Sequence, residues 1–166
     1  MIPFNLLAWL HGKDYRKPET KEAAFRHQLC WGRHYELMVG AFLTNCGISV
    51  SMAAATDVEK QKERKSVPDL FADGYRIECK STKLAQLPKL VPLESVRAYK
   101  NKQPKPDFYV LVSKKTWKMV WVPGNNPKIL KPGRAHAKPY YLVAREHFRP
   151  IQDLVALLKH PRFTLA

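Results

Sequence analysis

Residues 67–80 read Val-Pro-Asp-Leu-Phe-Ala-Asp-Gly-Tyr-Arg-Ile-Glu-Cys-Lys, with an Asp-Gly pair between two apolar runs. An Asp-Gly pair in this setting is a strong signal for a β-hairpin, because both residues tolerate the backbone conformations of a tight turn. With this pair at the turn, Leu70 faces Ile77 and Asp69 faces Glu78. The segment therefore predicts a hairpin whose register is fixed by its turn.

The same register places charged side chains together on one face of the hairpin. Asp69 and Glu78 become direct cross-strand neighbours, with Cβ atoms roughly 4.5–5.5 Å apart. Since side chains alternate along a strand, Lys80 shares the face of Glu78, whereas Cys79 points to the core with Leu70. Two like charges opposite each other destabilise a sheet, so this face is expected to need a cation.

The three charged groups have the chemistry of a metal-dependent hydrolase. Mg²⁺ is typically held by one or two carboxylates with water and phosphate oxygens, and the Lys80 ammonium could orient a water or stabilise developing charge. This combination predicts hydrolysis of a phosphodiester. Two simpler interpretations stay open: Asp69 as a turn cap, and Glu78 with Lys80 as a solvent-facing pair. Asp73 is expected to be a turn residue only.

The flanking segments predict an α/β or α+β fold around one mixed sheet. Thr20 is a suitable N-cap for a helix that ends near Gly47. A largely apolar stripe is expected along this helix, made of Phe25, Leu29, Gly32, Glu36, Val39, Gly40 and Leu43. Strands are expected at 48–52, 67–71, 75–81, 108–113, 119–122 and 140–143, and a closing helix at 151–158. Loops are expected at 57–66 and 125–138, and a loop or short helix at 84–100.

Charge narrows the class of partner. The chain has 166 residues and a formal net charge of +15, and between Arg97 and Arg149 it has 13 basic residues against two acids. Such a block attracts polyanions, because phosphate contacts release condensed counterions. Nucleic acid is the expected partner, and a solvated basic surface is the alternative. The residues expected to contact the phosphate backbone are Lys65, Lys83, Lys89, Lys114, Lys115, Lys131 and Arg134.

Length and composition predict one domain at 21–166, preceded by an arm at 1–20. Three cysteines without a C-x-x-C pair argue against a disulfide framework or a zinc ribbon, and they fit a reducing compartment. The apolar start at 1–10 is shorter than the roughly 20 residues of a membrane span and lacks the basic leader of a signal peptide. An intracellular protein is therefore expected.

Pro68-Asp69, eight residues, then Glu78-Cys79-Lys80 resembles the PD-(D/E)XK nuclease superfamily. The resemblance implies a restriction endonuclease-like core, with a mixed central β-sheet flanked by helices. It implies that Asp69 and Glu78 bind Mg²⁺, for which Mn²⁺ can substitute, helped by the carbonyl of Cys79. It also implies that Lys80 is the partner of the attacking water.

Glu36 extends the resemblance to the first helix. In residues 32–40, Gly-Arg-His-Tyr-Glu-Leu-Met-Val-Gly, it matches the glutamate that Holliday junction resolvases and related nucleases have upstream of the aspartate. The match implies a catalytic role for Glu36 as a second-site or water-mediated metal ligand. A carboxylate on a core-facing stripe is costly unless it is paired or metal-bound. A salt bridge to Arg33 or Arg76 is the alternative.

These features predict a Mg²⁺-dependent DNA endonuclease guided by DNA structure, such as a junction or branch, with short-site restriction as an alternative. A homodimer is compatible with this function, because symmetric cutting of two strands needs two sites. A basic nucleic-acid-binding module without catalysis and an RNA-directed nuclease are the competing hypotheses. The family likeness would suit the cytoplasm of a bacterial cell or a phage-infected host.

Overall fold

The computed structural model describes residues 21–52, 68–102, 104–135 and 137–160, and for residues 21–31 it describes the backbone alone. The predicted arm and the predicted loop at 57–66 lie outside the described residues. The elements are α2 (Lys21–Asn45), β1 (Val50–Met52), β2 (Leu70–Ala72), β3 (Tyr75–Thr82), β4 (Leu90–Ser95), α4 (Val96–Asn101), β5 (Phe108–Ser113), β6 (Met119–Pro123), β7 (Lys131–Ala135), β8 (Lys138–Ala144), η1 (Arg145–His147), β9 (Arg149–Pro150) and α5 (Ile151–Lys159).

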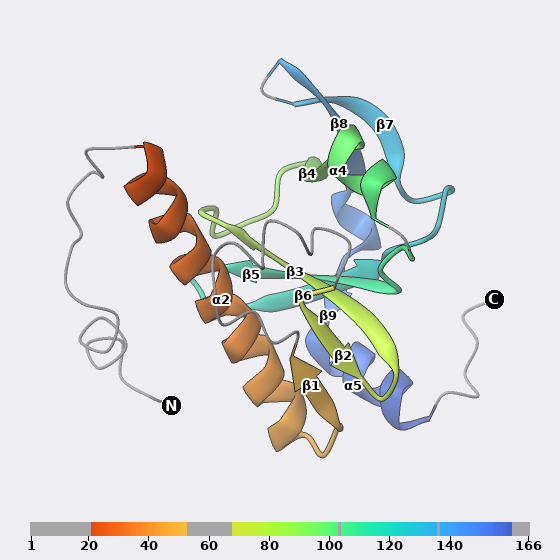
Figure 1. Cartoon of the computed structure of the whole chain (residues 1–166). Coiled ribbons are helices and arrows are strands. Elements are labelled where there is room, and N and C mark those ends of the chain that lie inside the picture. Colours follow the sequence, from red (N-terminus) through yellow and green to blue (C-terminus); the bar gives the residue numbers. More distant parts are fainter. Residues whose placement is uncertain (1–20, 53–67, 103, 136, 161–166) are drawn as a thin grey trace.

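The central sheet has the strand order β1-β2-β3-β5-β6-β9 (Figure 1). Strands β3 and β5 are parallel and the other neighbouring pairs are antiparallel, so the sheet is mixed, as predicted. The β2–β3 hairpin has the predicted register, with Leu70 opposite Ile77. Its turn is formed by Asp73 and Gly74, at φ angles of 45° and 85°. The prediction of a mixed central sheet flanked by helices is therefore confirmed.

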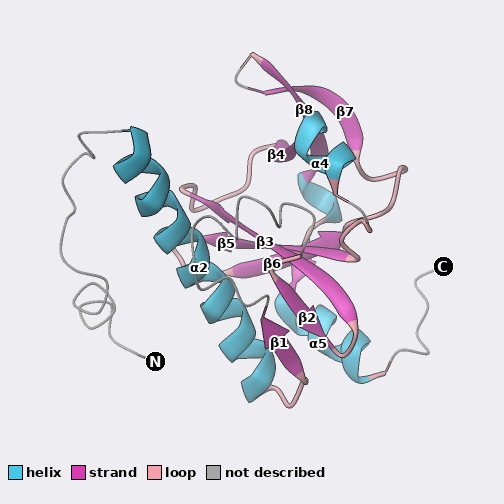
Figure 2. Cartoon of the chain, in the orientation of Figure 1, coloured by secondary structure: helices cyan, strands magenta, loops and turns pink. Residues whose placement is uncertain are grey.

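A second, three-stranded sheet with the order β4-β8-β7 lies next to α4 (Figure 2). The loop predicted at 125–138 is wrong, because the segment contains β7. The loop or short helix predicted at 84–100 is correct for the loop at 84–89 and for α4, but it misses β4. Both strands contain a proline, Pro92 in β4 and Pro132 in β7. A proline within a segment argues against a strand when only the sequence is known. Both strands are sheet edges, where a residue without an N–H is tolerated.

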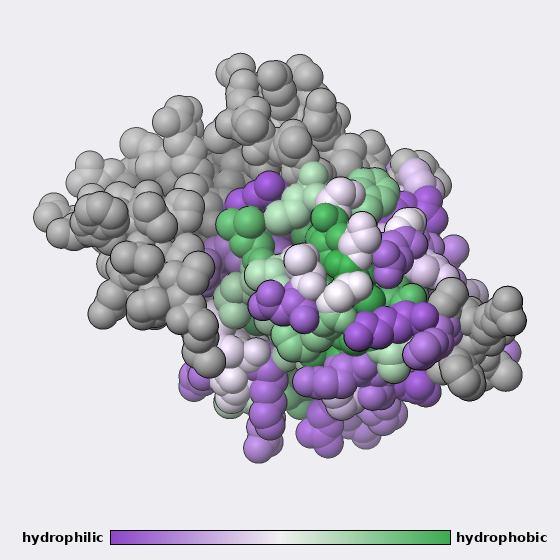
Figure 3. Space-filling view, turned by 90° about the horizontal axis from the view of Figure 1, so that it is seen from below, coloured by the Kyte–Doolittle hydropathy of each residue, from purple (hydrophilic) through white to green (hydrophobic). Residues whose placement is uncertain are grey.

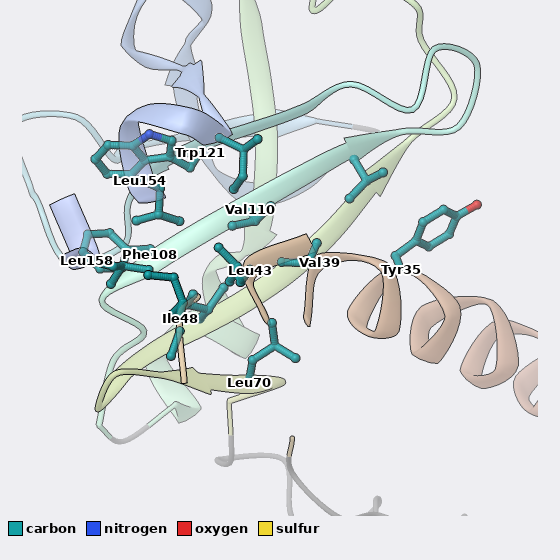
Figure 4. Packing of buried hydrophobic residues seen from close by; sticks show 14 residues of the cluster. Tyr35, Val39, Leu43, Ile48, Leu70, Phe108, Val110, Trp121, Leu154 and Leu158 are labelled. Carbon is teal, nitrogen blue, oxygen red and sulfur yellow. The ribbon is translucent and has the colours of Figure 1, made fainter. Parts of the chain in front are cut away.

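Both faces of the central sheet are covered. On one face, α2 and α5 pack against the sheet in a cluster that includes Tyr35, Val39, Leu43, Leu70, Ile77, Val110, Leu154 and Leu158 (Figure 4). On the other face, β4, β8 and the β6–β7 connection contribute to a second cluster of Leu93, Tyr109, Val122, Leu130 and Val143. The middle of β3, at Ile77 and Glu78, is therefore buried, whereas Arg76, Lys80 and Ser81 are reached by solvent.

The stripe predicted on α2 is confirmed in part. Val39, Gly40 and Leu43 are buried, whereas Gly32 is exposed. Gly40 packs closely against the sheet, next to Val50, Met52 and Leu70, whereas the predicted side chains of Phe25 and Leu29 lie outside the described ones. The second half of α2 therefore anchors the helix to the sheet.

Figure 3 shows the molecule from below, where hydrophobic residues gather near the centre of the view with hydrophilic residues around them. Partly buried residues such as Met52, Val155 and Leu157 extend the first cluster toward the surface. Among the helices that the structure describes, none is long and apolar enough to cross a membrane.

Candidate active site

Asp69 is held against the middle of β3 by the hairpin. It lies one residue before β2, and its Oδ2 accepts a hydrogen bond of 2.7 Å from the backbone N–H of Cys79. This bond ties the carboxylate to the strand that carries Glu78 and Lys80. Asp69 is therefore bound across the hairpin, rather than acting only as a cap of its own turn.

Asp69 lies within electrostatic reach of two other carboxylates. Burial, followed by the negative charges of Glu78 and Glu36, raises the pKa of Asp69 to about 7, although Lys80 and the Cys79 N–H lower it. The repulsion predicted between Asp69 and Glu78 is thus a property of the fold. The positive charge of Lys80 therefore does not offset the effect of burial and of the two other carboxylates on Asp69.

Glu78 and Lys80 form a direct ion pair on the face of β3 that points to the second cluster. The Lys80 Nζ donates to Glu78 Oε1 at 2.7 Å, and Glu78 is only 5% exposed. The interpretation of these residues as a solvent-facing pair is therefore wrong. Burial lowers the pKa of Lys80, but the charges of Glu78, Glu94 and Asp69 outweigh it and raise that pKa above its ordinary value.

Glu94 and Lys102 complete the charge arrangement, and the sequence analysis does not identify either of them. Lys102 Nζ donates to Glu78 Oε1 and to Glu94 Oε1, the latter at 2.7 Å. Lys80 Nζ also lies 3.4 Å from Glu94 Oε1. Glu94 is 6% exposed and Lys102 9% exposed. The Lys80 side chain is partly exposed, at 28%. We refer to Glu78, Lys80, Glu94 and Lys102 as the buried quartet, after its three buried members.

An irregularity in β4 turns Glu94 inward. The register of β4 against β8 shifts between Pro92 and Glu94, so Leu93 and Glu94 are both buried although they are consecutive. The Glu94 Oε2 accepts a 2.5 Å hydrogen bond from the hydroxyl of Tyr109, a fully buried residue opposite Glu78 in β5. Side chains alternate along a regular strand, so the burial of both Leu93 and Glu94 could not be expected without knowledge of the bulge.

Glu36 and Cys79 lie at the edge of this arrangement. The Arg33 Nη1 donates to Glu36 Oε2 at 3.0 Å, which is one of the two ion pairs considered for Glu36. Arg76, the other candidate, pairs instead with Asp107. The Cys79 thiol is half-buried against the first cluster, as predicted, and burial raises its pKa.

The candidate phosphate-binding residues fall into two groups. Lys83 and Lys114 follow the adjacent parallel strands β3 and β5, where the Lys114 N–H donates to the Thr82 carbonyl at 2.8 Å. Burial and the charge of Lys83 lower the pKa of Lys114, so the two ammonium groups are near each other. Of the seven candidates, Lys114 is partly buried, Lys65 lies outside the described residues, and the exposed ones are Lys83, Lys89, Lys115, Lys131 and Arg134.

The donor set suits a hard divalent cation. Asp69 and Glu78 offer carboxylate oxygens, which Mg²⁺ and Mn²⁺ prefer. Among the described residues, no three His, Cys, Asp or Glu side chains gather closely enough to enclose a metal ion. An ion held by Asp69 and Glu78 would therefore take its other ligands from water and phosphate oxygens. The ligand roles of Asp69, Glu78, Cys79 and Glu36 stay predictions.

Comparison with solved structures finds similarity to D212, a nuclease from a fusselovirus, with 13% sequence identity and a TM-score of 0.41. The match covers 91% of this chain and 100% of the other. A likeness at this TM-score is too weak to transfer an activity or a site. No family model matches the sequence, and no curated protein matches it.

Proposed function

We propose that this protein is a metal-dependent nuclease that hydrolyses phosphodiester bonds in DNA. The convergence of Asp69, Glu78 and Lys80 on one hairpin, in a chain with a net charge of +15, carries the proposal. Ion pairs removed from water are expensive to form, and strongly shifted pKa values gather at functional sites. A purely structural strand pair would not need this arrangement.

Asp69 and Glu78 would hold the ion, with the carbonyl of Cys79 as the third group that the sequence pattern implies. A bound Mg²⁺ or Mn²⁺ would supply a water of lowered pKa and shield the negative charge of the phosphate. The raised pKa of Lys80 keeps its Nζ protonated at neutral pH. Lys80 therefore acts as a hydrogen-bond donor that orients water or stabilises the charge developing on the phosphate, rather than as the base.

The basic groups would bind the backbone of the substrate. Lys83, Lys114 and Lys115 follow the strands that carry Lys80 and its neighbours, and Lys131 and Arg134 lie on β7. Contacts of this kind position a duplex without reading its sequence, which favours cutting guided by DNA structure. Cutting of both strands would use a second copy of the chain, and light scattering of the DNA complex would test that assembly.

Cleavage of labelled DNA with Mg²⁺ or Mn²⁺ tests the proposal. A duplex, a four-way junction, a single strand and an RNA are compared, using the wild type, Asp69→Asn and Lys80→Met. The matched control is Asp107→Asn, which makes the same carboxylate-to-amide change in the ion pair with Arg76. We expect cutting by the wild type and the control, loss of cutting in the two site variants, and retained DNA binding in all four.

The competing hypotheses give different results in the same assay. A basic binding module without catalysis would bind every substrate and cut none, with either metal. An RNA-directed nuclease would cut RNA in preference to every DNA. Cutting that survives in both Asp69→Asn and Lys80→Met would contradict the assignment of this site.

A further inference from the structure

The two carboxylates of the buried quartet are used differently. Glu94 is bound at both oxygens, because Oε1 faces Lys80 and Lys102 and Oε2 accepts from the Tyr109 hydroxyl. In the structure's described part, the lysine hydrogen bonds to Glu78 both end on Oε1. Glu94 therefore has the contacts of a fixed anchor, whereas Glu78 directs one oxygen to the lysines.

The quartet is also balanced in charge, with two carboxylates and two ammonium groups. Glu78, Glu94 and Lys102 are each at most 9% exposed, so little solvent screens them from one another. If Glu78 also bound a divalent ion, Lys80 and Lys102 would both still have Glu94 as a hydrogen-bond acceptor. Without Glu94, the ammonium groups of Lys80 and Lys102 would compete with the ion for one carboxylate.

We infer that Glu94 and Lys102 are positioning residues of the active site, which hold Lys80 and Glu78 in place and set the net charge that a divalent cation meets there. This inference rests on the proposed nuclease function. Neither residue belongs to the Asp69, Glu78 and Lys80 pattern, and neither is expected to touch the scissile phosphate. Both act through Glu78 and Lys80, to which the structure connects them directly.

The charge balance gives the two residues opposite effects on metal binding. Glu94→Gln keeps the side-chain shape but leaves one excess positive charge, so it should weaken Mn²⁺ binding. Lys102→Met leaves one excess negative charge, so it should strengthen Mn²⁺ binding. Replacing a group that supports a metal ligand typically changes affinity or activity by about 10- to 100-fold. The double variant restores neutrality and should bind Mn²⁺ close to the wild-type affinity.

Calorimetric titration of the DNA-free full chain with Mn²⁺ measures these affinities directly. Thermal unfolding of each variant first establishes the temperature at which it is folded. Asp107→Asn is the charge-matched control, and its Mn²⁺ affinity should equal that of the wild type. Should Glu94→Gln fail to fold, Lys102→Met alone decides the question, because damage to the structure would not tighten metal binding.

Steady-state cleavage provides the second readout. Because Glu94 contacts Lys80 and not the phosphate-binding lysines, Glu94→Gln should lower kcat by about 10- to 100-fold while KM changes little. DNA affinity measured with Ca²⁺ in place of Mn²⁺ should stay the same or rise slightly. A merely structural role would lower the folded fraction without separating kcat from KM.

The outcomes distinguish failure of the inference from failure of the proposed function. A wild-type protein that neither binds Mn²⁺ nor cleaves overturns the proposed function, and the inference with it. A wild type that binds and cleaves, with Glu94→Gln and Lys102→Met shifting Mn²⁺ affinity in the same direction or not at all, overturns the inference alone. Opposite shifts with near-normal affinity in the double variant support it.

Discussion

Strand β3 carries two ion clusters of different construction. Near its start, Arg76 pairs with Asp107 through contacts of 3.2 Å, and the two side chains are 30% and 31% exposed. Farther along, Glu78 and Lys80 join Glu94 and Lys102 in the buried quartet. Both of its carboxylate side chains are 6% exposed and the Lys102 side chain is 11% exposed, whereas that of Lys80, at 28%, is about as exposed as Arg76. The Arg76–Asp107 pair lies where solvent reaches both side chains, whereas solvent reaches the quartet mainly at Lys80 and leaves its two carboxylates buried.

The effect of each ion cluster on the stability of the fold depends on how much solvent reaches it. An exposed pair gains about 0–1 kcal/mol, because water screens the charges and the side chains lose conformational freedom. A buried cluster loses several kcal/mol to desolvation for each ion, so well-packed apolar residues would often stabilise the same place equally well. The quartet is thus a poor device for stability alone, and its presence favours a role in chemistry.

The largest expected effect is on stability, from breaking the quartet. Lys102→Met leaves two buried carboxylates facing one ammonium, so it should lower the free energy of unfolding by about 3–5 kcal/mol. Urea unfolding of wild type and variant with EDTA present measures the loss. A loss under about 1 kcal/mol, as expected of an exposed pair, would contradict the burial that distinguishes the two clusters.

The next effect is on catalysis. Lys80→Met removes the ammonium group that donates to Glu78. Loss of one hydrogen-bond donor that stabilises developing charge usually lowers kcat by about 10²–10³-fold. DNA affinity with Ca²⁺ should change far less, because the proposed contacts with the DNA backbone are spread over many other basic residues. Single-turnover cleavage and fluorescence anisotropy measure the two quantities. Equal losses of kcat and DNA affinity would show that Lys80 is only one more phosphate contact.

The sequence predicts the hairpin part of the site because its determinants are local. The Asp-Gly turn sets the register, and alternation then puts Glu78 and Lys80 on one face and Cys79 on the other. The Glu36 ion pair with Arg33 is also local, since the two residues are one helical turn apart. Each of these contacts depends only on spacing along one element or across one turn.

Glu94 and Lys102 could not be predicted in the same way. The burial of Glu94 depends on a register shift after Pro92 and on the packing of a whole second sheet over β3. Lys102 directly follows α4, in a segment so basic that a single lysine resembles its solvated neighbours. Long-range packing, rather than local spacing, brings these two residues to the site.

A pH-dependent effect follows from Asp69. Because its pKa is raised to about 7 in the fold, the folded protein binds more protons than the unfolded chain between about pH 4 and pH 7. The stabilising contribution of the Asp69 carboxyl group is present at low pH and is lost as the pH rises through about 7. Asp69→Asn should therefore be more stable than the wild type at about pH 8, by a few kcal/mol at most.

Urea unfolding at about pH 5 and about pH 8, with EDTA present, measures this difference. In the Asp69→Asn variant the Cys79 N–H can still donate to the oxygen of the new side-chain amide, so the comparison isolates the charge. Parallel pH dependence in wild type and variant would mean that the carboxylate is not held at raised pKa.

The smallest effect is expected at the exposed pair. Asp107→Asn removes one charge, but an amide oxygen can still accept the hydrogen bond that the Arg76 backbone N–H now donates to Asp107 at 2.8 Å. The free energy of unfolding should fall by about 0–1 kcal/mol, and kcat should stay at the wild-type value. Urea unfolding and the cleavage assay measure both. A loss as large as that of Lys102→Met would mean that charge pairing, rather than burial, governs both clusters on β3, and the case for a specialised quartet would fail.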